Sequence, residues 1–136
     1  MTIVLQAVEK MAGVERHLYP LDLEFETGSL TVLLGPIRAG KTSVMRLMAG
    51  LDRPSAGRIL ENGKDVTGVD VRRRDVAMVY QQFINYPNFT VYDNIASPLK
   101  VAGKLDRAAR DQRVREIARQ LGLEELLDRL PAELSV

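Results

Sequence analysis

The fold of this chain is decided by residues 35–42, which read Gly35-Pro36-Ile37-Arg38-Ala39-Gly40-Lys41-Thr42. They match the pattern G-x-x-x-x-G-K-[ST] in full, and because glycine is only about 7% of an average sequence, a chance match is rare. The apolar stretch 30–34 predicts a short buried strand before the loop. Residues 41–49 predict a helix that ends at Gly50. A strand, a glycine-bracketed loop and a helix together form the context that a phosphate-binding loop requires.

Such a loop binds polyphosphate mainly through its backbone. Successive N–H groups point at the anion, and the N-terminus of the following helix adds the positive end of its dipole. We expect Lys41 to contact the β- and γ-phosphates as a positive charge, and the Thr42 hydroxyl to bind the Mg²⁺ that accompanies a nucleotide. The sequence therefore predicts a nucleotide phosphate site.

The overall composition is that of an ordinary globular domain. The 136 residues are 46% hydrophobic and 27% charged, with a net charge of +1, whereas a nucleic-acid or membrane-surface binder typically has a basic excess. There is no cysteine and one histidine, so disulfides and thiolate metal sites are excluded. No apolar run has the 18 or more residues of a membrane span, and the N-terminus lacks the features of a signal peptide.

The first part of the chain predicts mainly β-structure. Strands are expected at residues 2–8, 21–26, 30–34 and 76–80, and a hairpin at 58–61 and 64–66 around Asn62-Gly63, two residue types that accept positive φ. Residues 9–17 are interpreted as a turn. Pro20 suits the beginning of the strand 21–26, because the missing N–H is harmless there. The charged run 72–75 is interpreted as a solvated approach to the strand 76–80.

The later part of the chain predicts helices. They are expected at residues 91–101, 107–121 and 123–130, with Thr90 and Asp106 as N-caps and Gly122 ending the second. Pro98 should kink or end the first helix near its last turn. Before these helices, Ile84, Tyr86 and Phe89 lie in a loop, where they either form an exposed partner surface or pack inward.

Several stretches together resemble the ATPase subunits of ATP-binding-cassette (ABC) transporters, especially carbohydrate-uptake importers. The main ones are Val76-Ala77-Met78-Val79-Tyr80-Gln81-Gln82-Phe83-Ile84-Asn85-Tyr86-Pro87-Asn88-Phe89-Thr90-Val91-Tyr92-Asp93-Asn94-Ile95 and Leu51-Asp52-Arg53-Pro54-Ser55-Ala56-Gly57. Tyr19-Pro20, the run 81–87 and Ile95-Ala96-Ser97-Pro98-Leu99 are similar to the glycerol-uptake subgroup.

The resemblance implies an α/β fold of the P-loop NTPase type, with an incomplete RecA-like core. An N-terminal antiparallel β subdomain and the partial core would occupy residues 1–87, and the beginning of a helical subdomain residues 88–136. ATP and Mg²⁺ are the implied cofactors. Lys41 and Gln81 are implied as catalytic residues, since Gln81 matches the loop glutamine that approaches Mg²⁺ and the attacking water. Thr42 and Gln81 would contact the metal, and Ser43 an α- or β-phosphate oxygen.

The same resemblance implies partners and a location. Residues 82–92 would contact the transmembrane permease subunits, and a second, identical or different ATPase subunit would complete a dimer. No nucleic-acid partner is expected. The chain would lie at the cytoplasmic face of the membrane and be attached there through its partner subunits.

Two departures from the family pattern affect these expectations. The position of the aromatic residue that usually contacts adenine falls near Ala12, where no aromatic stands, so either Tyr19 or His17 substitutes for it or adenine is held weakly. Residues 131–135 resemble the approach to the Leu-Ser-Gly-Gly-Gln signature, but the sequence stops at Val136, before the signature, the Mg²⁺-binding aspartate, the catalytic glutamate and the switch histidine.

Because a water-orienting group is a required part of phosphoryl transfer, we expect this stretch alone not to be a competent ATPase and interpret it as the truncated N-terminal part of a longer subunit. The alternatives are a non-catalytic nucleotide-binding fragment and a non-transport ABC ATPase. A small-molecule P-loop kinase is disfavoured, since no arginine-rich lid is apparent.

Overall fold

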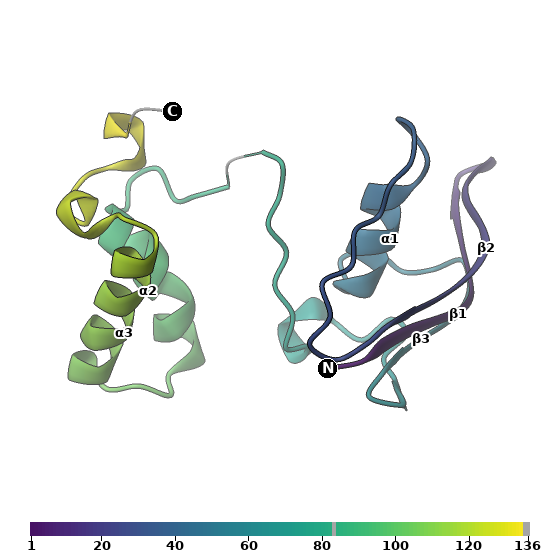
Figure 1. The fold of residues 1–136 in the computed structure, drawn as a ribbon, viewed down its shortest axis with the longest axis horizontal. Helices are drawn as coiled ribbons and strands as arrows, with labels where there is room; N and C mark the ends of the chain where they lie inside the picture. Colours follow the sequence, from purple (N-terminus) through teal and green to yellow (C-terminus); the bar gives the residue numbers. More distant parts are fainter. Residues whose placement is uncertain (83, 135–136) are drawn as a thin grey trace. The chain divides into compact units, whose positions relative to one another are not determined.

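The computed structural model describes residues 1–82 and 84–134, so Phe83 of the glutamine-loop stretch and Ser135 of the expected signature approach lie outside the described residues. The chain divides into two compact units, Met1–Val79 and Tyr80–Val136 (Figure 1). Within the described ranges, no helix combines the length and the apolar character that a membrane span requires.

The first unit is built on an antiparallel sheet of order β2-β1-β3-β4. Its strands are β1 (Ile3–Ala12), β2 (Glu15–Phe25), β3 (Ala56–Glu61) and β4 (Lys64–Asp65). The β1–β2 hairpin pairs from Ile3↔Phe25 to Ala12↔Glu15, so the expectation of a turn over residues 9–17 is wrong. Its register shifts at three places, where bulges accommodate a sequence that does not alternate strictly. Pro20 lies inside β2 and not at its beginning, which is tolerated because β2 is an edge strand.

The predicted Asn62-Gly63 hairpin is confirmed between β3 and β4. Asn62 has φ 49° and Gly63 has φ 78°, the two positive values that a type I′ turn needs. Earlier in β3, Gly57 passes so close to the bulge in β1 that an added Cβ would lie 2.3 Å from the Ala7 carbonyl oxygen. This position therefore requires glycine for space as well as for its φ of 83°.

Helix α1 (Lys41–Met48) packs on the sheet, and this packing positions the loop before it (Figure 1). Its inward residues Val44 and Leu47 join a core formed with Ile3, Leu5, Val8, Leu18, Ile59 and Val66. The helix ends as predicted at Gly50, whose N–H donates to the Leu47 carbonyl while the Leu51 N–H donates to Arg46. These two bonds form a Schellman motif, in which glycine takes the left-handed position.

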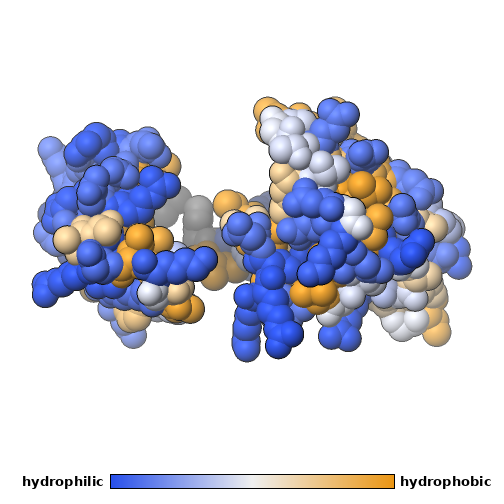
Figure 2. All heavy atoms as spheres, turned by 90° about the horizontal axis from the view of Figure 1, so that it is seen from below, coloured by the Kyte–Doolittle hydropathy of each residue, from blue (hydrophilic) through white to orange (hydrophobic). Residues whose placement is uncertain are grey.

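The predicted strands 30–34 and 76–80 are absent, which corrects both expectations. Neither segment pairs with another strand among the described residues, and Leu30, Leu34 and Val79 are 94%, 89% and 91% exposed. Apolar parallel strands are buried on both faces only when neighbouring strands and helices cover them. Figure 2 shows apolar patches among the hydrophilic side chains of the surface.

The charged run 72–75 is not wholly solvated, because Arg74 is buried. A short 3₁₀ helix, η1 (Val71–Arg73), turns the chain so that the Arg74 side chain is only 2% exposed. There its Nη2 lies 3.1 Å from a Glu61 carboxylate oxygen. Burial of a guanidinium is tolerated when a carboxylate pairs with it.

The second unit pairs α2 (Val91–Ala102) with α3 (Arg107–Gln120). Their shared core consists of Val91, Ala96, Val114, Ala118 and Leu127. Both predicted N-caps are confirmed: the Thr90 hydroxyl accepts from the Asp93 N–H, and the Asp106 carboxylate accepts from the Ala109 N–H. Pro98 lies inside α2, which continues beyond it to Ala102 and has Gly103 as its C-cap.

The expectation of a helix at residues 123–130 is wrong. Only the 3₁₀ turn η2 (Glu124–Leu126) forms there, followed by η3 (Pro131–Glu133). The eight residues 123–130 contain one buried side chain, Leu127, which is too little apolar contact to stabilise two helical turns.

Candidate nucleotide-binding site

The loop of residues 35–40 joins the segment 30–34 to α1 in an anion-binding backbone conformation. Arg38 and Gly40 have φ values of 69° and 83°, and left-handed residues in such a turn point backbone N–H groups into a common concavity. Gly40 is also the N-cap of α1 and offers no side-chain cap, so the first N–H groups of the helix stay open at this end. The loop and the helix start thus present donors to an anion.

The Lys41 side chain stabilises the loop by hydrogen bonds to two of its carbonyl groups. Its Nζ donates to the carbonyl oxygens of Gly35 at 2.7 Å and Pro36 at 2.8 Å. An ammonium group has three N–H donors, so Lys41 can hold both carbonyls and still offer one donor to a phosphate oxygen. Thr42 follows with an exposed hydroxyl, and Ser43 is half-buried.

Two open clefts meet at Lys41. One, of about 410 Å³, extends over β2, and the other, of about 670 Å³, extends along residues 28–33 and includes Thr42. Both volumes lie in the range of small-molecule sites, about 300–1,000 Å³. The loop therefore borders spaces that can hold the parts of a nucleotide beyond its phosphates.

The loop is held against β2 by a contact that the sequence did not indicate. A Cβ built on Gly40 would lie 2.4 Å from Leu18 Cδ2 and 3.2 Å from the His17 carbonyl oxygen. Leu18 is 6% exposed and belongs to the core, so it has little freedom to move away. Gly40 is therefore required both for its φ and for this approach of the loop to β2.

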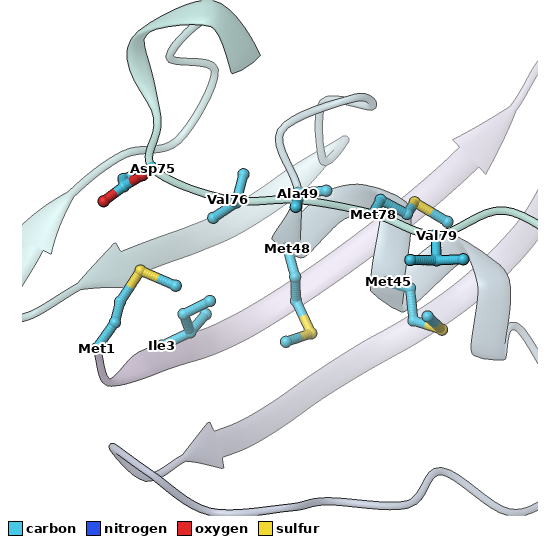
Figure 3. Close-up of a pocket in the computed structure, with 10 residues that line it drawn as sticks. Met1, Ile3, Met45, Met48, Ala49, Asp75, Val76, Met78 and Val79 are labelled. Atoms are coloured by element: carbon cyan, nitrogen blue, oxygen red, sulfur yellow. The ribbon is translucent and has the colours of Figure 1, made fainter. Parts of the chain in front are cut away.

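A third cleft, of about 400 Å³, lies beside α1 but away from the loop. Figure 3 shows Met1, Met45 and Met48 around it, with the segment 75–79 along one side. Flexible methionine side chains fill irregular apolar space. Asp75 is the one charged side chain that lines this cleft, and the other side chains that line it are apolar.

Magnesium would depend on few protein ligands. In residues 1–82 and 84–134, no group of three or more His, Asp or Glu side chains is placed to hold a metal ion. Mg²⁺ at nucleotide sites is usually held by phosphate oxygens, waters and one or two side chains. The exposed Thr42 hydroxyl next to Lys41 fits that pattern.

Gln81 and the loop that follows belong to the second unit. Gln81 and Gln82 are exposed, and Ile84, Tyr86 and Phe89 are 70%, 56% and 42% exposed. Of the two possibilities left open by the sequence, these three side chains thus form an exposed surface and do not pack inward. The rings of Tyr86 and Phe89 contact each other in a tilted arrangement, with a centroid distance of 5.0 Å and an interplanar angle of 35°.

Asn94 organises this loop, and the sequence analysis missed its role. Its Oδ1 accepts from the Tyr86 N–H at 2.8 Å, and its Nδ2 donates to the carbonyls of Tyr86, Phe89 and Thr90 at 3.0–3.1 Å. The feature of the sequence that could have indicated this role is an asparagine four residues after the N-cap Thr90. Nearby, a hydrogen bond from Lys100 lowers the pKa of Asp93.

With this geometry in place, comparisons with known proteins identify the family. Residues 18–136 match the family described as ABC transporter. The chain belongs to the ABC transporter family. The match begins at Leu18, on β2, and includes the phosphate loop, α1 and the helices of the second unit.

Curated relatives of this ABC-family chain are ATP-binding proteins of import systems. The trehalose/maltose import ATP-binding protein MalK of Thermococcus litoralis is 46% identical over 134 residues, covering 94% of this chain and 36% of the relative. The Fe(3+) ions import protein FbpC of Photobacterium profundum and the sulfate/thiosulfate import protein cysA of Cucumis sativus are each 40% identical, covering 98% and 99% of this chain and 38% and 39% of theirs. The chain thus spans less than two fifths of the length of these relatives, and the solutes in their names differ.

A solved structure confirms the predicted fold class. It is an ATP-binding cassette in a dimeric, post-hydrolysis state bound to ADP and Pi, with a TM-score of 0.85 and 25% identity over 98% of this chain and 63% of that one. The antiparallel sheet, the P-loop and the helices are therefore part of a P-loop NTPase domain of the ABC type.

Proposed function

We propose that this chain binds Mg·ATP through residues 35–43 as the N-terminal part of an import ATPase. The observation that carries the proposal is the loop itself, in which Arg38 and Gly40 have positive φ, Lys41 holds two loop carbonyls, and α1 begins with open N–H groups. In this assignment the backbone of residues 35–40 and Lys41 hold the β- and γ-phosphates, Ser43 donates to an α- or β-phosphate, and Thr42 ligates Mg²⁺.

We assign hydrolysis to the import ATPase of which this chain corresponds to one part. Lys41 would stabilise the charge on the transferred phosphoryl group, and Gln81 would orient Mg²⁺ and the attacking water. Phosphoryl transfer needs positioning and charge stabilisation more than covalent chemistry, and both residues serve those ends. The helical subdomain is assigned to residues 88–136, with the core and β subdomain before it.

The proposed partners are permease subunits and a second ATPase subunit. Residues 82–92 are the proposed permease contact, supported by the exposed rings of Tyr86 and Phe89, which contact each other. A dimer is supported by the dimeric state of the related solved structure. The site of action would be the cytoplasmic face of the membrane, reached through these partners.

For the solute we propose a sugar or polyol, with glycerol as the specific candidate. This rests on the runs Tyr19-Pro20, 81–87 and 95–99 and on the relative named for trehalose and maltose. Transport into vesicles that contain the cognate permease, measured with glycerol and with maltose as alternatives, tests it. Uptake of neither solute would overturn this assignment and leave ATP binding unaffected.

ATP binding is tested by calorimetric titration of the whole chain with and without Mg²⁺. Lys41→Ala should abolish binding, and Thr42→Ala should weaken binding only when Mg²⁺ is present. Lys10→Ala is the matched control, because Lys10 is a lysine of the same unit whose Nζ donates to the Arg53 carbonyl, outside both clefts at the loop. Equal affinity of the wild type and Lys41→Ala would refute the proposal.

A further inference from the structure

The tip of the phosphate loop is a tight turn with an arginine at its third position. The Ala39 N–H donates to the Pro36 carbonyl at 3.2 Å, and Arg38 has φ 69°, whereas φ of Ile37 is not positive. This combination is characteristic of a type II turn, in which glycine or asparagine normally takes the third position. Arginine has a Cβ, so the left-handed conformation costs free energy that glycine would not lose. Because such residues cluster at functional sites, the outlier indicates a role for the Arg38 side chain.

The Arg38 guanidinium is exposed to solvent. Within the described part of the chain, it has no ion pair with a carboxylate and no side-chain hydrogen bond. Residues 27–51 contain Arg38, Lys41 and Arg46 but no Asp or Glu. Arg46 pairs with Asp52, whose carboxylate oxygen lies 2.9 Å from the Arg46 Nε. The loop therefore carries a second positive charge beside that of Lys41, and an anion can bind to it without first displacing a carboxylate.

Arg38 also supplies hydrogen-bond donors that Lys41 lacks. Two of the three N–H groups of Lys41 are taken by the carbonyls of Gly35 and Pro36, which leaves one for a phosphate. A guanidinium has five N–H donors in a planar fork and can bind two phosphate oxygens at once. Arg38 precedes Lys41 by three residues, so their Cα atoms are at most about 11 Å apart. Two long side chains that begin this close together can contact one polyphosphate.

We propose that the Arg38 guanidinium binds the terminal phosphate of the nucleotide held by residues 35–43, and that it makes the site prefer a triphosphate to a diphosphate. This inference rests on the proposed function and extends it from the loop backbone and Lys41 to a second cationic side chain. The terminal phosphate carries the additional charge of a triphosphate, so a second cation favours the triphosphate over the diphosphate. The contact also gives a reason for arginine at a position where glycine would be less strained.

The test is calorimetric titration of the whole chain with ATP, ADP and inorganic triphosphate, each in the presence of Mg²⁺. Arg38→Asn removes the charge and keeps a residue type that tolerates positive φ. It should weaken the binding of ATP and of triphosphate about tenfold, or ~1.4 kcal/mol, and the binding of ADP no more than about twofold. Arg38→Lys should retain most of the ATP affinity, because it keeps the charge. Arg73→Ala is the matched control, since Arg73 is an exposed arginine of the same unit that lines neither cleft at the loop.

Urea unfolding without nucleotide provides a second readout. Asparagine is less strained than arginine at φ 69°, so Arg38→Asn should raise the urea midpoint of the first unit while it weakens ATP binding. A substitution that only damaged the loop would lower both the midpoint and the affinity. A fall in both quantities would therefore show a structural role for Arg38 and overturn the proposal.

The titrations separate this inference from the proposed function. If Arg38→Asn leaves ATP affinity unchanged while Lys41→Ala abolishes it, the role of Arg38 is wrong and the phosphate site stands. Equal weakening by Arg38→Asn and Arg73→Ala would also overturn it, because net charge and not a contact would then be the cause. Equal weakening of ATP and ADP would exclude the terminal phosphate as the group that Arg38 binds. If the wild type binds none of the three anions, the proposed function fails and this inference fails with it.

Discussion

Replacing Gly40 by alanine tests the contact between the phosphate loop and β2. An alanine at φ 83° costs about 1–2 kcal/mol of backbone strain. The new methyl group would also lie 2.4 Å from Leu18 Cδ2 and 3.2 Å from the His17 carbonyl oxygen, and overpacking a core adds about 1–3 kcal/mol. We therefore expect Gly40→Ala to lower the free energy of unfolding by about 2–5 kcal/mol.

Gly63→Ala is the matched control, because Gly63 has φ 78° with no atom within 4 Å of an added Cβ. Gly63→Ala should lower the free energy of unfolding only by the backbone strain, about 1–2 kcal/mol. Both glycines lie in the unit Met1–Val79, so urea unfolding followed by circular dichroism reports the same transition for each. ATP affinity should fall for Gly40→Ala alone. Equal loss of stability in the two variants would refute the argued contact with β2.

Three further predictions concern side chains away from the loop. Asn94→Ala should lower the free energy of unfolding by about 1–3 kcal/mol and accelerate amide hydrogen exchange in the loop before α2, measured by mass spectrometry. Unchanged exchange would contradict the four hydrogen bonds of Asn94. Glu61→Ala should lower the free energy of unfolding in urea by about 3 kcal/mol, because it leaves the buried Arg74 unpaired. Adding Arg74→Met should restore part of this loss. If the effects of the two substitutions on the free energy of unfolding simply add, the ion pair does not contribute. A hydrogen bond from Arg46 lowers the pKa of Asp52, so its stabilisation is present above the unfolded pKa, about 3.9, and is lost as pH falls through the lower folded value. Asp52→Asn should therefore flatten the acid limb of a stability-against-pH curve, and an unchanged limb would exclude this ion pair as its source.

Features that depend on neighbouring residues in the sequence were predicted well. The caps Thr90 and Asp106, the turn at Asn62-Gly63 and the helix end at Gly50 each need only a side chain or a φ value within one turn of chain. Local hydrogen bonds decide these features, and a few residues encode them. The phosphate loop belongs to the same class, since its conformation and its lysine lie within eight residues.

Features that depend on distant partners were predicted poorly. The segments 30–34 and 76–80 have the composition of buried strands, yet a strand forms only when another strand supplies its hydrogen bonds. Arg74 looked like part of a solvated run because its partner, Glu61, lies 13 residues away at the end of β3. The length of the β1–β2 hairpin was underestimated for a related reason, since bulges preserve pairing through a sequence with no strict alternation.

The candidate site depends on both local and distant contacts. Only the part that depends on local contacts could be predicted from the sequence. The phosphate side is contiguous: Lys41 holds the carbonyls of Gly35 and Pro36, and so preserves the loop conformation while one of its donors remains for an anion. The support of the loop by β2 is not contiguous, because it depends on the approach of Gly40 to Leu18, which lies 22 residues earlier in the chain. A phosphate ligand should therefore bind whenever the loop and α1 are formed. Support of the loop additionally requires the β1–β2 hairpin, so a change that loosens Gly40 from β2 should lower the free energy of unfolding of the first unit before it abolishes phosphate binding.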